Sequence, residues 1–278
     1  MKSKSVLLAF IAVGLALSVG GILKGQELVQ DARIVYTSRQ IKAYSKALAA
    51  FQKQYHALPG DMANAGSKLK GCTGDKGGDC NPAPATAGDS IIGNPDFIKT
   101  LKPQITGITN VPAVTAGDES VLFWTHLHLA GLITDVTDDG LQNGSKIEFG
   151  TLLPESRYHG GLFFGYDSGF IVGYSDGTSV PPSLSPPNTI FKGTIVAQIS
   201  SDVLSGAAEP NAPDQQALTP LRAAQIDRKM DDGRPLTGYV RGYGAPGCMN
   251  AAAEVYNEQN GARDCNLIYF LDGFRNDP

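Results

Sequence analysis

The stretch that decides the fold runs from Gly20 to Asp61 and reads GGILKGQELVQDARIVYTSRQIKAYSKALAAFQKQYHALPGD. It starts inside an apolar run and contains no proline before the turn signal Pro59-Gly60. Apolar side chains recur at steps of three and four, which predicts a helix with one apolar stripe. Because proline lacks an amide hydrogen and restricts the residue before it, we expect this helix to end at Leu58. The residues of the predicted packing stripe are Ile41, Tyr44, Leu48, Phe51, Tyr55 and Leu58.

Upstream of this helix, residues 6–23 carry no charge and follow the basic residues Lys2 and Lys4. At a rise of 1.5 Å per residue they span about 27 Å, close to the thickness of a hydrocarbon core. Residues 1–23 are therefore interpreted as a membrane anchor or as a secretory signal peptide, and both carry the chain out of the cytoplasm. The positive-inside rule places the rest of the chain on the outer side of the membrane. Since helical sequence runs straight on as an amphipathic stalk over residues 24–58, we expect one continuous helix about 80 Å long.

Beyond residue 58 the sequence changes character, because most of its 33 glycines and 17 prolines lie there. This predicts a globular head over residues 59–278 with a loop-rich insertion at 64–117. Two short helices are expected, one over residues 119–130 capped by Asp118 and one that starts at Thr219-Pro220. Strand-like runs cover residues 146–150, 161–175, 193–200, 238–244 and 266–272. The expected fold class is α+β, with the long N-terminal helix packed on an antiparallel sheet.

Charge and motif content bear on the class of function. The net charge is −4, the isoelectric point is near 5.6, and the lysines and arginines are scattered, so no nucleic-acid partner is expected. A hydrolase or nucleotide-binding enzyme would show a nucleophile elbow, a zinc-binding H-E-x-x-H or a glycine-rich phosphate loop, and the sequence has none of these. We therefore expect a protein without enzymatic activity, and no small-molecule substrate is identified.

The four cysteines fall into two pairs that are close in sequence, Cys72 with Cys80 and Cys248 with Cys265. Four cysteines allow three pairings, so the sequence leaves the connectivity open. No C-x-x-C motif occurs, which argues against zinc or thioredoxin-like redox chemistry. We expect disulfides because an exported chain folds in an oxidising compartment, and four free thiols in a cytosolic protein are the alternative.

Two groups of side chains are candidates for metal binding. Asp227, Asp231 and Asp232 lie near a turn and offer hard oxygen ligands, so a weak calcium site is one hypothesis and a purely structural turn is the other. His126 and His128 would share a metal if they stood on a strand, but on a helix residues i and i+2 point in different directions. For the two histidines we expect packing roles, and apart from the calcium hypothesis no cofactor is expected.

Several stretches of the chain resemble the type IV pilin-like proteins, which include the pseudopilins of type II secretion systems. The resemblance is closest to a large-headed bacterial subgroup in which GGILKGQEL continues the membrane helix and ALPGD ends the stalk, here at residues 20–28 and 57–61. Further matches are FWTHLHLAGLI at 123–133, LTPLRAAQIDRKMDDGRPLTGYVR at 218–241 and C…CNLIYFLD at 248–272.

The resemblance implies a pilin-like fold and a non-enzymatic subunit of a type IV pilus or type II secretion filament in the bacterial envelope. It implies other pilin-like subunits as partners, bound through the N-terminal helix. It also implies a single-pass position in the inner membrane with the head in the periplasm, or a place in an extracellular filament. The size of the head favours a minor subunit, and calcium in a head loop is a property of the major pseudopilins.

One position departs from the family pattern. The prepilin leader ends in glycine, followed by phenylalanine and by a glutamate at the fifth mature position, and that glutamate position falls on Leu7 here. Either translation starts upstream of Met1, or the N-terminus is processed as an ordinary signal anchor or signal peptide. The alternative function is a membrane-anchored or secreted periplasmic binding module that has a pilin-like head and does not assemble.

Overall fold

The computed structural model describes residues 2–72, 119–137, 147–171, 190–200, 212–250 and 254–271, together with residues 80–82, 84, 87, 88 and 92. Within these ranges, residues 2–23, 164–171 and 190–197 are described by their backbone alone. Asp118, the predicted helix cap, and most of the 64–117 insertion lie outside the described residues.

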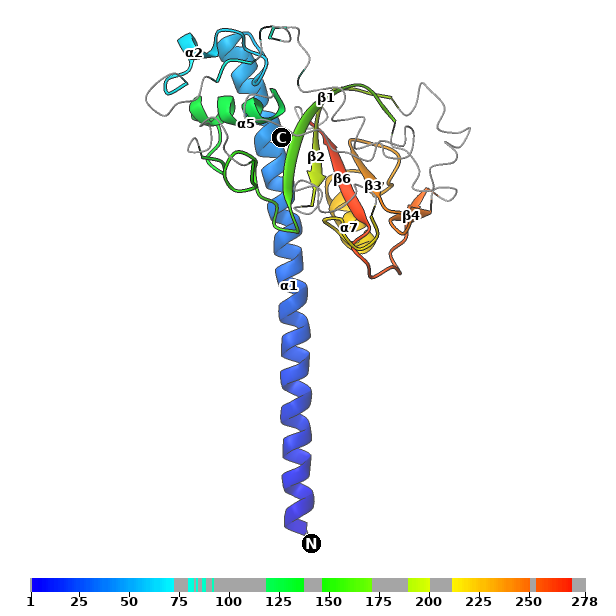
Figure 1. Ribbon diagram of the computed structural model, residues 1–278. Coiled ribbons are helices and arrows are strands. Elements are labelled where there is room, and N and C mark those ends of the chain that lie inside the picture. The colour runs from blue at the N-terminus through cyan, green and yellow to red at the C-terminus, as the bar shows by residue number, and fades with distance from the viewer. Residues whose placement is uncertain are drawn as a thin grey trace.

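A single helix, α1 (Lys2–Tyr55), forms the axis of the molecule. Its C-terminal half lies along the head, and its N-terminal half projects clear of every other element (Figure 1). The helix ends at Tyr55 rather than at the predicted Leu58, because the ring of Pro59 would clash with the carbonyl group of Tyr55 and because His56 turns into the left-handed region at φ 53°. Within the described residues no helix is long and apolar enough to cross a membrane, and the side chains of residues 6–23 lie outside that description.

The head is built on a four-stranded antiparallel sheet with the strand order β1-β2-β6-β3. Its strands are β1 (Gly161–Ile171), β2 (Ile190–Ile199), β3 (Val240–Gly244) and β6 (Cys265–Phe270). β1 and β2 pair with a register shift between Asp167 and Phe170, and β6, the last strand in the sequence, lies between β2 and β3. A separate two-stranded ribbon consists of β4 (Met249–Asn250) and β5 (Val255–Tyr256). The α+β class with a long N-terminal helix is thus confirmed.

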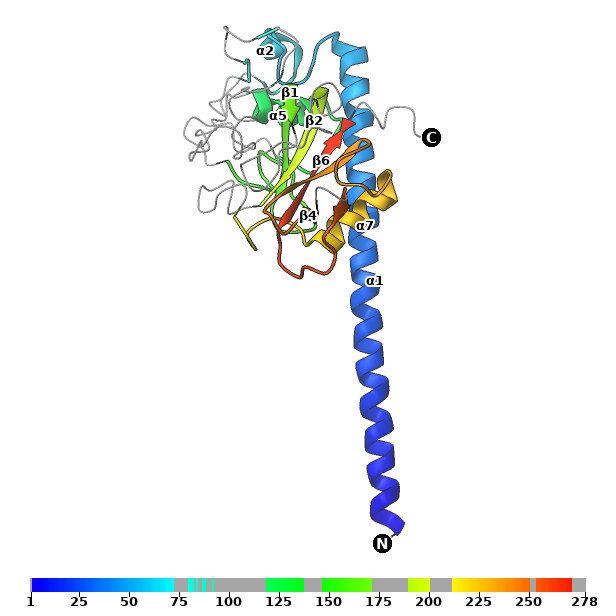
Figure 2. The same ribbon diagram turned by 90° about the vertical axis from the view of Figure 1, so that its right-hand side faces the viewer.

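Three short helices complete the described part of the head: α2 (Ala65–Lys68), α5 (Glu119–Leu129) and α7 (Pro220–Met230). α7 begins as the sequence predicts, because the Thr219 hydroxyl accepts a hydrogen bond from the amide of Arg222 at 3.4 Å. α5 stops before Gly131, which has φ 71°. Figure 2 shows α7 lying beside α1, and both α5 and α7 contact that helix.

The strand predicted over residues 146–150 is wrong for the described residues 147–150. Only Phe149 forms a bridge there, with Leu153. Gly150 has φ 81° and its amide donates to the carbonyl oxygen of Leu153 at 2.8 Å, so the chain turns instead of extending. The other predicted runs overlap β1, β2, β3 and β6, although β2 begins three residues and β6 one residue before the predicted start, and residues 172–175 of the first run lie outside the described residues.

The predicted packing stripe forms the face of α1 that enters the core. Its last two residues, Tyr55 and Leu58, are half-buried at the edge of the core, and its first four are at most 2 % exposed. The four are Ile41, Tyr44, Leu48 and Phe51. Burial of side chains of this size stabilises a fold by roughly 2 kcal/mol each, so together they contribute about as much as the whole stability of a typical domain. α1 therefore cannot leave the head without unfolding it.

The turn after α1 depends on a close approach at Gly60. This residue has φ 87°, and a Cβ atom placed on it would lie 2.4 Å from the carbonyl oxygen of Glu119, the first residue of α5. Glycine is therefore required here both by its backbone angle and by the space available.

We predict that Gly60→Ala lowers the free energy of unfolding by roughly 2–4 kcal/mol, because it combines a strained φ with a backbone clash. Urea denaturation of the full chain measures this. The matched control is Gly25→Ala on the projecting part of α1, where an added Cβ meets nothing within 4 Å. That change should leave stability unaltered or raise it by at most about 1 kcal/mol. Equal losses in both variants would contradict the account of Gly60.

Candidate functional site

α1 divides near Ile34 into a projecting part and an embedded part. Residues 24–33 are exposed apart from the half-buried Gln30, whereas Ile34 is buried and begins the face that enters the head. Two neighbouring apolar side chains, Leu28 and Val29, are 68 % and 52 % exposed. Since the packing stripe is used inside the head, residues 24–33 are the described stretch of α1 whose side chains lie outside the head and are exposed almost without interruption.

The embedded part of α1 also buries polar side chains. The amide nitrogen of Gln40 lies 2.8 Å from the Tyr44 hydroxyl and 3.1 Å from the carbonyl oxygen of Glu155. The Tyr44 hydroxyl donates to the carboxylate of Asp135. Burial, together with the negative charge of Asp135, raises the pKa of Tyr44 above its ordinary value. The sequence analysis placed Tyr44 in the packing stripe but missed Gln40 and Asp135, because a polar residue within an apolar face and a partner far away in the chain carry no periodic signal.

Two further contacts fix α1 against the head. The Ser45 hydroxyl donates to the carbonyl oxygen of Leu271 at 2.7 Å, directly after the end of β6. The ring of Tyr44 meets Trp124 of α5 edge to face, with 4.8 Å between the ring centroids. Apolar burial alone has no direction, so these oriented contacts set the rotation and height of the helix on the head.

His126 of α5 joins the end of α1 to the first disulfide loop. Its Nδ1 accepts a hydrogen bond from the amide of Gly60 at 2.8 Å, and its Nε2 donates to the carbonyl oxygen of Cys80 at 2.7 Å. Both ring nitrogens are thus occupied by backbone groups, as a packing role requires. Burial lowers the pKa of His126 to about 4, and the bond to Cys80 acts in the opposite direction. His128 is half-buried, and its Nδ1 has no hydrogen-bond partner among the described residues.

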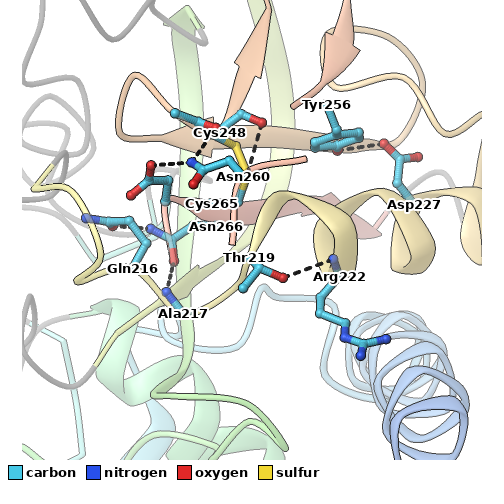
Figure 3. The surroundings of a disulfide bond; sticks show 12 residues. Gln216, Ala217, Thr219, Arg222, Asp227, Cys248, Tyr256, Asn260, Cys265 and Asn266 are labelled. Atoms are coloured by element: carbon cyan, nitrogen blue, oxygen red, sulfur yellow. Dashed lines mark hydrogen bonds between the residues drawn. A yellow bond between two sulfur atoms is a disulfide. The ribbon is translucent and has the colours of Figure 1, made fainter. Parts of the chain in front are cut away.

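Both cysteine pairs form disulfides, which resolves the pairing that the sequence left open. Cys72 bonds Cys80 with 5.3 Å between their Cα atoms, and Cys248 bonds Cys265 with 4.9 Å. Figure 3 shows the second bond next to Asn260, whose amide group donates to the carbonyl oxygen of Gly247 at 3.0 Å. This disulfide joins the start of β6 to the segment before β4 and, on the chain-entropy argument, stabilises the head by roughly 3 kcal/mol.

The three aspartates at the end of α7 come together, with one oxygen of each within 4.8 Å of the others. Asp227 is buried and accepts hydrogen bonds from the amide of Gly233 at 3.0 Å and from the hydroxyl of Tyr256 at 2.8 Å. Burial raises the pKa of Asp227 to about 7, although both hydrogen bonds favour its charged form. Asp227 thus holds the end of α7 against β5.

The other two aspartates close the turn that follows α7. Asp231 accepts from the amide of Val240 at 3.0 Å, and Asp232 accepts from the amide of Arg234 at 2.8 Å. Burial lowers the pKa of Arg241, and the nearby charges of Asp231 and Asp232 act in the opposite direction. These bonds support the structural-turn hypothesis, and the nearby guanidinium weakens the attraction of the cluster for a second cation. Calcium binding stays a prediction.

The calcium hypothesis predicts that millimolar calcium raises the melting temperature of the full chain and that Asp231→Ala removes the rise. Calcium binds the charged carboxylate, so with a pKa of about 7 at Asp227 the rise should be larger at pH 8 than at pH 6. The matched control is Glu258→Gln, which removes an exposed acid that is paired with Arg228 outside the cluster. If calcium does not change the melting temperature, the calcium hypothesis is wrong and the purely structural turn is the hypothesis that remains.

We predict that His126 lowers the stability of the head as the pH falls from about 6.5 to 4, while Asp227, whose raised pKa makes the folded state bind a proton in the same range, acts in the opposite direction. An unfolded histidine binds a proton near pH 6.5 but the folded His126 only near pH 4, so protons favour the unfolded state in this window, by up to roughly 3 kcal/mol. Urea denaturation at several pH values measures the loss. Relative to the wild type, His126→Gln should gain stability over this range as the pH falls, whereas His159→Gln, at an exposed position, should follow the wild-type profile. Identical profiles for the wild type and His126→Gln would contradict the prediction.

Comparison with protein-family profiles, with curated proteins and with solved structures finds no match for this chain. The resemblance carried by the stretches at residues 20–28 and 57–61 therefore rests on those residues themselves.

Proposed function

We propose that this chain is a non-enzymatic, pilin-like subunit of a type IV pilus or type II secretion filament in the bacterial envelope, and a minor one. Before assembly, residues 1–23 anchor it in the inner membrane, and the head lies in the periplasm. The observation that carries the proposal is the form of α1, which runs unbroken from Lys2 to Tyr55 and leaves residues 24–33 exposed below the head.

An isolated helix in water gains little from its own hydrogen bonds, so a long projecting helix needs a partner or a bilayer around it. The part of α1 outside the head, residues 2–33, is roughly 48 Å long. Leu28 and Val29 follow one another on it, about 100° apart around the helix, each with more than half of its surface exposed. Helices from other copies that pack along residues 24–33 would bury this apolar surface, and a bilayer would cover the apolar segment before them. One helix can serve both surroundings, because lipid tails are about as apolar as leucine and close packing decides between them.

The polar groups of the head support a structural role. Tyr44, Gln40 and Asp135 bond to one another, and both nitrogens of His126 are used by backbone groups. Asp227 likewise bonds to a backbone amide and to a tyrosine. These titratable and polar side chains serve to hold elements together, which agrees with the absence of catalytic motifs from the sequence.

A photoreactive amino acid at Leu28 tests the proposal in cells that make the full chain. We expect adducts at multiples of the chain's mass, because the projecting helices of different copies lie together. The same amino acid at Lys53, an exposed position beside the head, is the matched control and should give at least about tenfold fewer adducts. Val29→Asp should reduce the Leu28 adducts, since a charge in a helix interface is costly.

The alternative, an anchored binding module that does not assemble, predicts no adducts between copies at Leu28. Mass spectrometry of the mature N-terminus separates the remaining cases. A methylated terminus supports prepilin processing from an upstream start, and an intact Met1 supports a signal anchor. Cleavage near Gly20 would remove much of the projecting helix and contradict filament assembly.

A further inference from the structure

Three arginines gather where α1 leaves the head, and we call Arg33, Arg157 and Arg222 the arginine collar. The guanidinium of Arg157 lies 4.2 Å from the centre of the Tyr36 ring on α1. Arg33 and Arg222 are both close enough to the neighbouring Tyr158 for their charges to act on its hydroxyl. Figure 3 shows the side chain of Arg222 extending from the start of α7 toward the α1 helix. The collar therefore lies beside the point from which the projecting helix emerges.

The positive charge of the collar is not balanced within the described part of the chain. None of its three guanidiniums forms an ion pair there, and Arg222 donates to the neutral amide oxygen of Gln225 at 2.7 Å. By contrast, Arg228 on the same helix binds both carboxylate oxygens of Glu258, at 3.0 and 2.7 Å. At the Tyr158 hydroxyl the charges of Arg222 and Arg33 are opposed by that of Asp31.

We propose that the arginine collar docks the base of the head on the anionic phosphates of the membrane surface. This rests on the proposed function, because it needs residues 6–23 in the bilayer. Arg33 stands ten residues after Leu23, about 15 Å along the helix. The headgroup layer takes up about 5–7 Å of that distance, and the rest is no longer than a Debye length of about 8–10 Å. Arg33 thus lies within electrostatic reach of lipid phosphates when the anchor is inserted, and Arg157, which contacts Tyr36 three residues farther along, lies about 4.5 Å beyond it on an upright helix.

The chemistry of the collar and of the segment below it fits this position. Guanidinium groups bind phosphate oxygens through paired hydrogen bonds and are less strongly hydrated than ammonium groups. Between the anchor and the collar, Lys24 is exposed and paired with Glu27, and the exposed Leu28 and Val29 offer apolar surface to the interface. A tilt of the helix would bring one side of the collar still closer to the lipid.

Amide hydrogen exchange of the full chain in lipid nanodiscs tests the proposal. One set of discs is zwitterionic phosphatidylcholine, and the other contains about one third anionic phosphatidylglycerol. We expect exchange in the turn 155–160 and in the first turn of α7 to be roughly tenfold slower in the anionic discs, and the difference to vanish at high salt. The Arg33→Gln, Arg157→Gln, Arg222→Gln triple variant should lose the difference, and the corresponding lysine variant should keep most of it.

The matched control removes three positive charges from the last turn of α7 and from the turn that follows it, through Arg228→Gln, Lys229→Gln and Arg234→Gln. This variant should keep the difference between the two kinds of disc. If the glutamine triple variant does not fold, the lipid and salt dependence of the wild type decides the question. A chain that stays in the discs but exchanges alike in both lipids overturns the docking and leaves the proposed function standing. A chain that elutes apart from both kinds of disc overturns the membrane position as well. Protection that appears equally in detergent, together with self-association, would assign the collar to a second copy and overturn lipid docking.

Discussion

The burial of one face of α1 in the head is the interaction on which every other part of the molecule depends. Ile41, Leu48 and Phe51 of this face supply the centre of the core, and α5 and α7 pack against the same helix. The apolar contact alone would leave the helix free to rotate or slide. The bonds of Gln40 and Ser45 remove that freedom, so the head is built around a helix in one defined position.

The same helix carries the surface that distinguishes this chain from an ordinary globular domain. Because α1 is continuous, the position of residues 24–33 in space is set by contacts that Gln40 and Tyr44 make farther along the same helix, inside the head. A filament contact or a bilayer around the projecting part therefore acts on a rigid element and not on a linker. The same contacts fix the position of Arg157 and Arg222, at the base of the head, relative to the projecting part of α1.

Much of this arrangement could be predicted from the sequence, because its signals are local and periodic. The stripe on α1, the Thr219 cap and the four cysteines each have a pattern that a single sequence displays. The strand predicted at 146–150 was wrong because a short apolar run does not reveal that Gly150 turns back on Leu153. The bonds of His126, Gln40 and Ser45 join residues far apart in the chain, so no spacing rule could find them. The arginine collar was missed likewise, since its members come from three separate segments.

The bond between Ser45 and Leu271 gives the molecule a mechanical property. A force applied along the projecting end of α1 enters the middle of the head and passes to the end of β6, one of the two inner strands of the sheet. Because the embedded face runs along the direction of such a force, its contacts are loaded in shear and share the load instead of opening one after another. The head is therefore held to α1 along the whole length of the embedded face, and not at a single point.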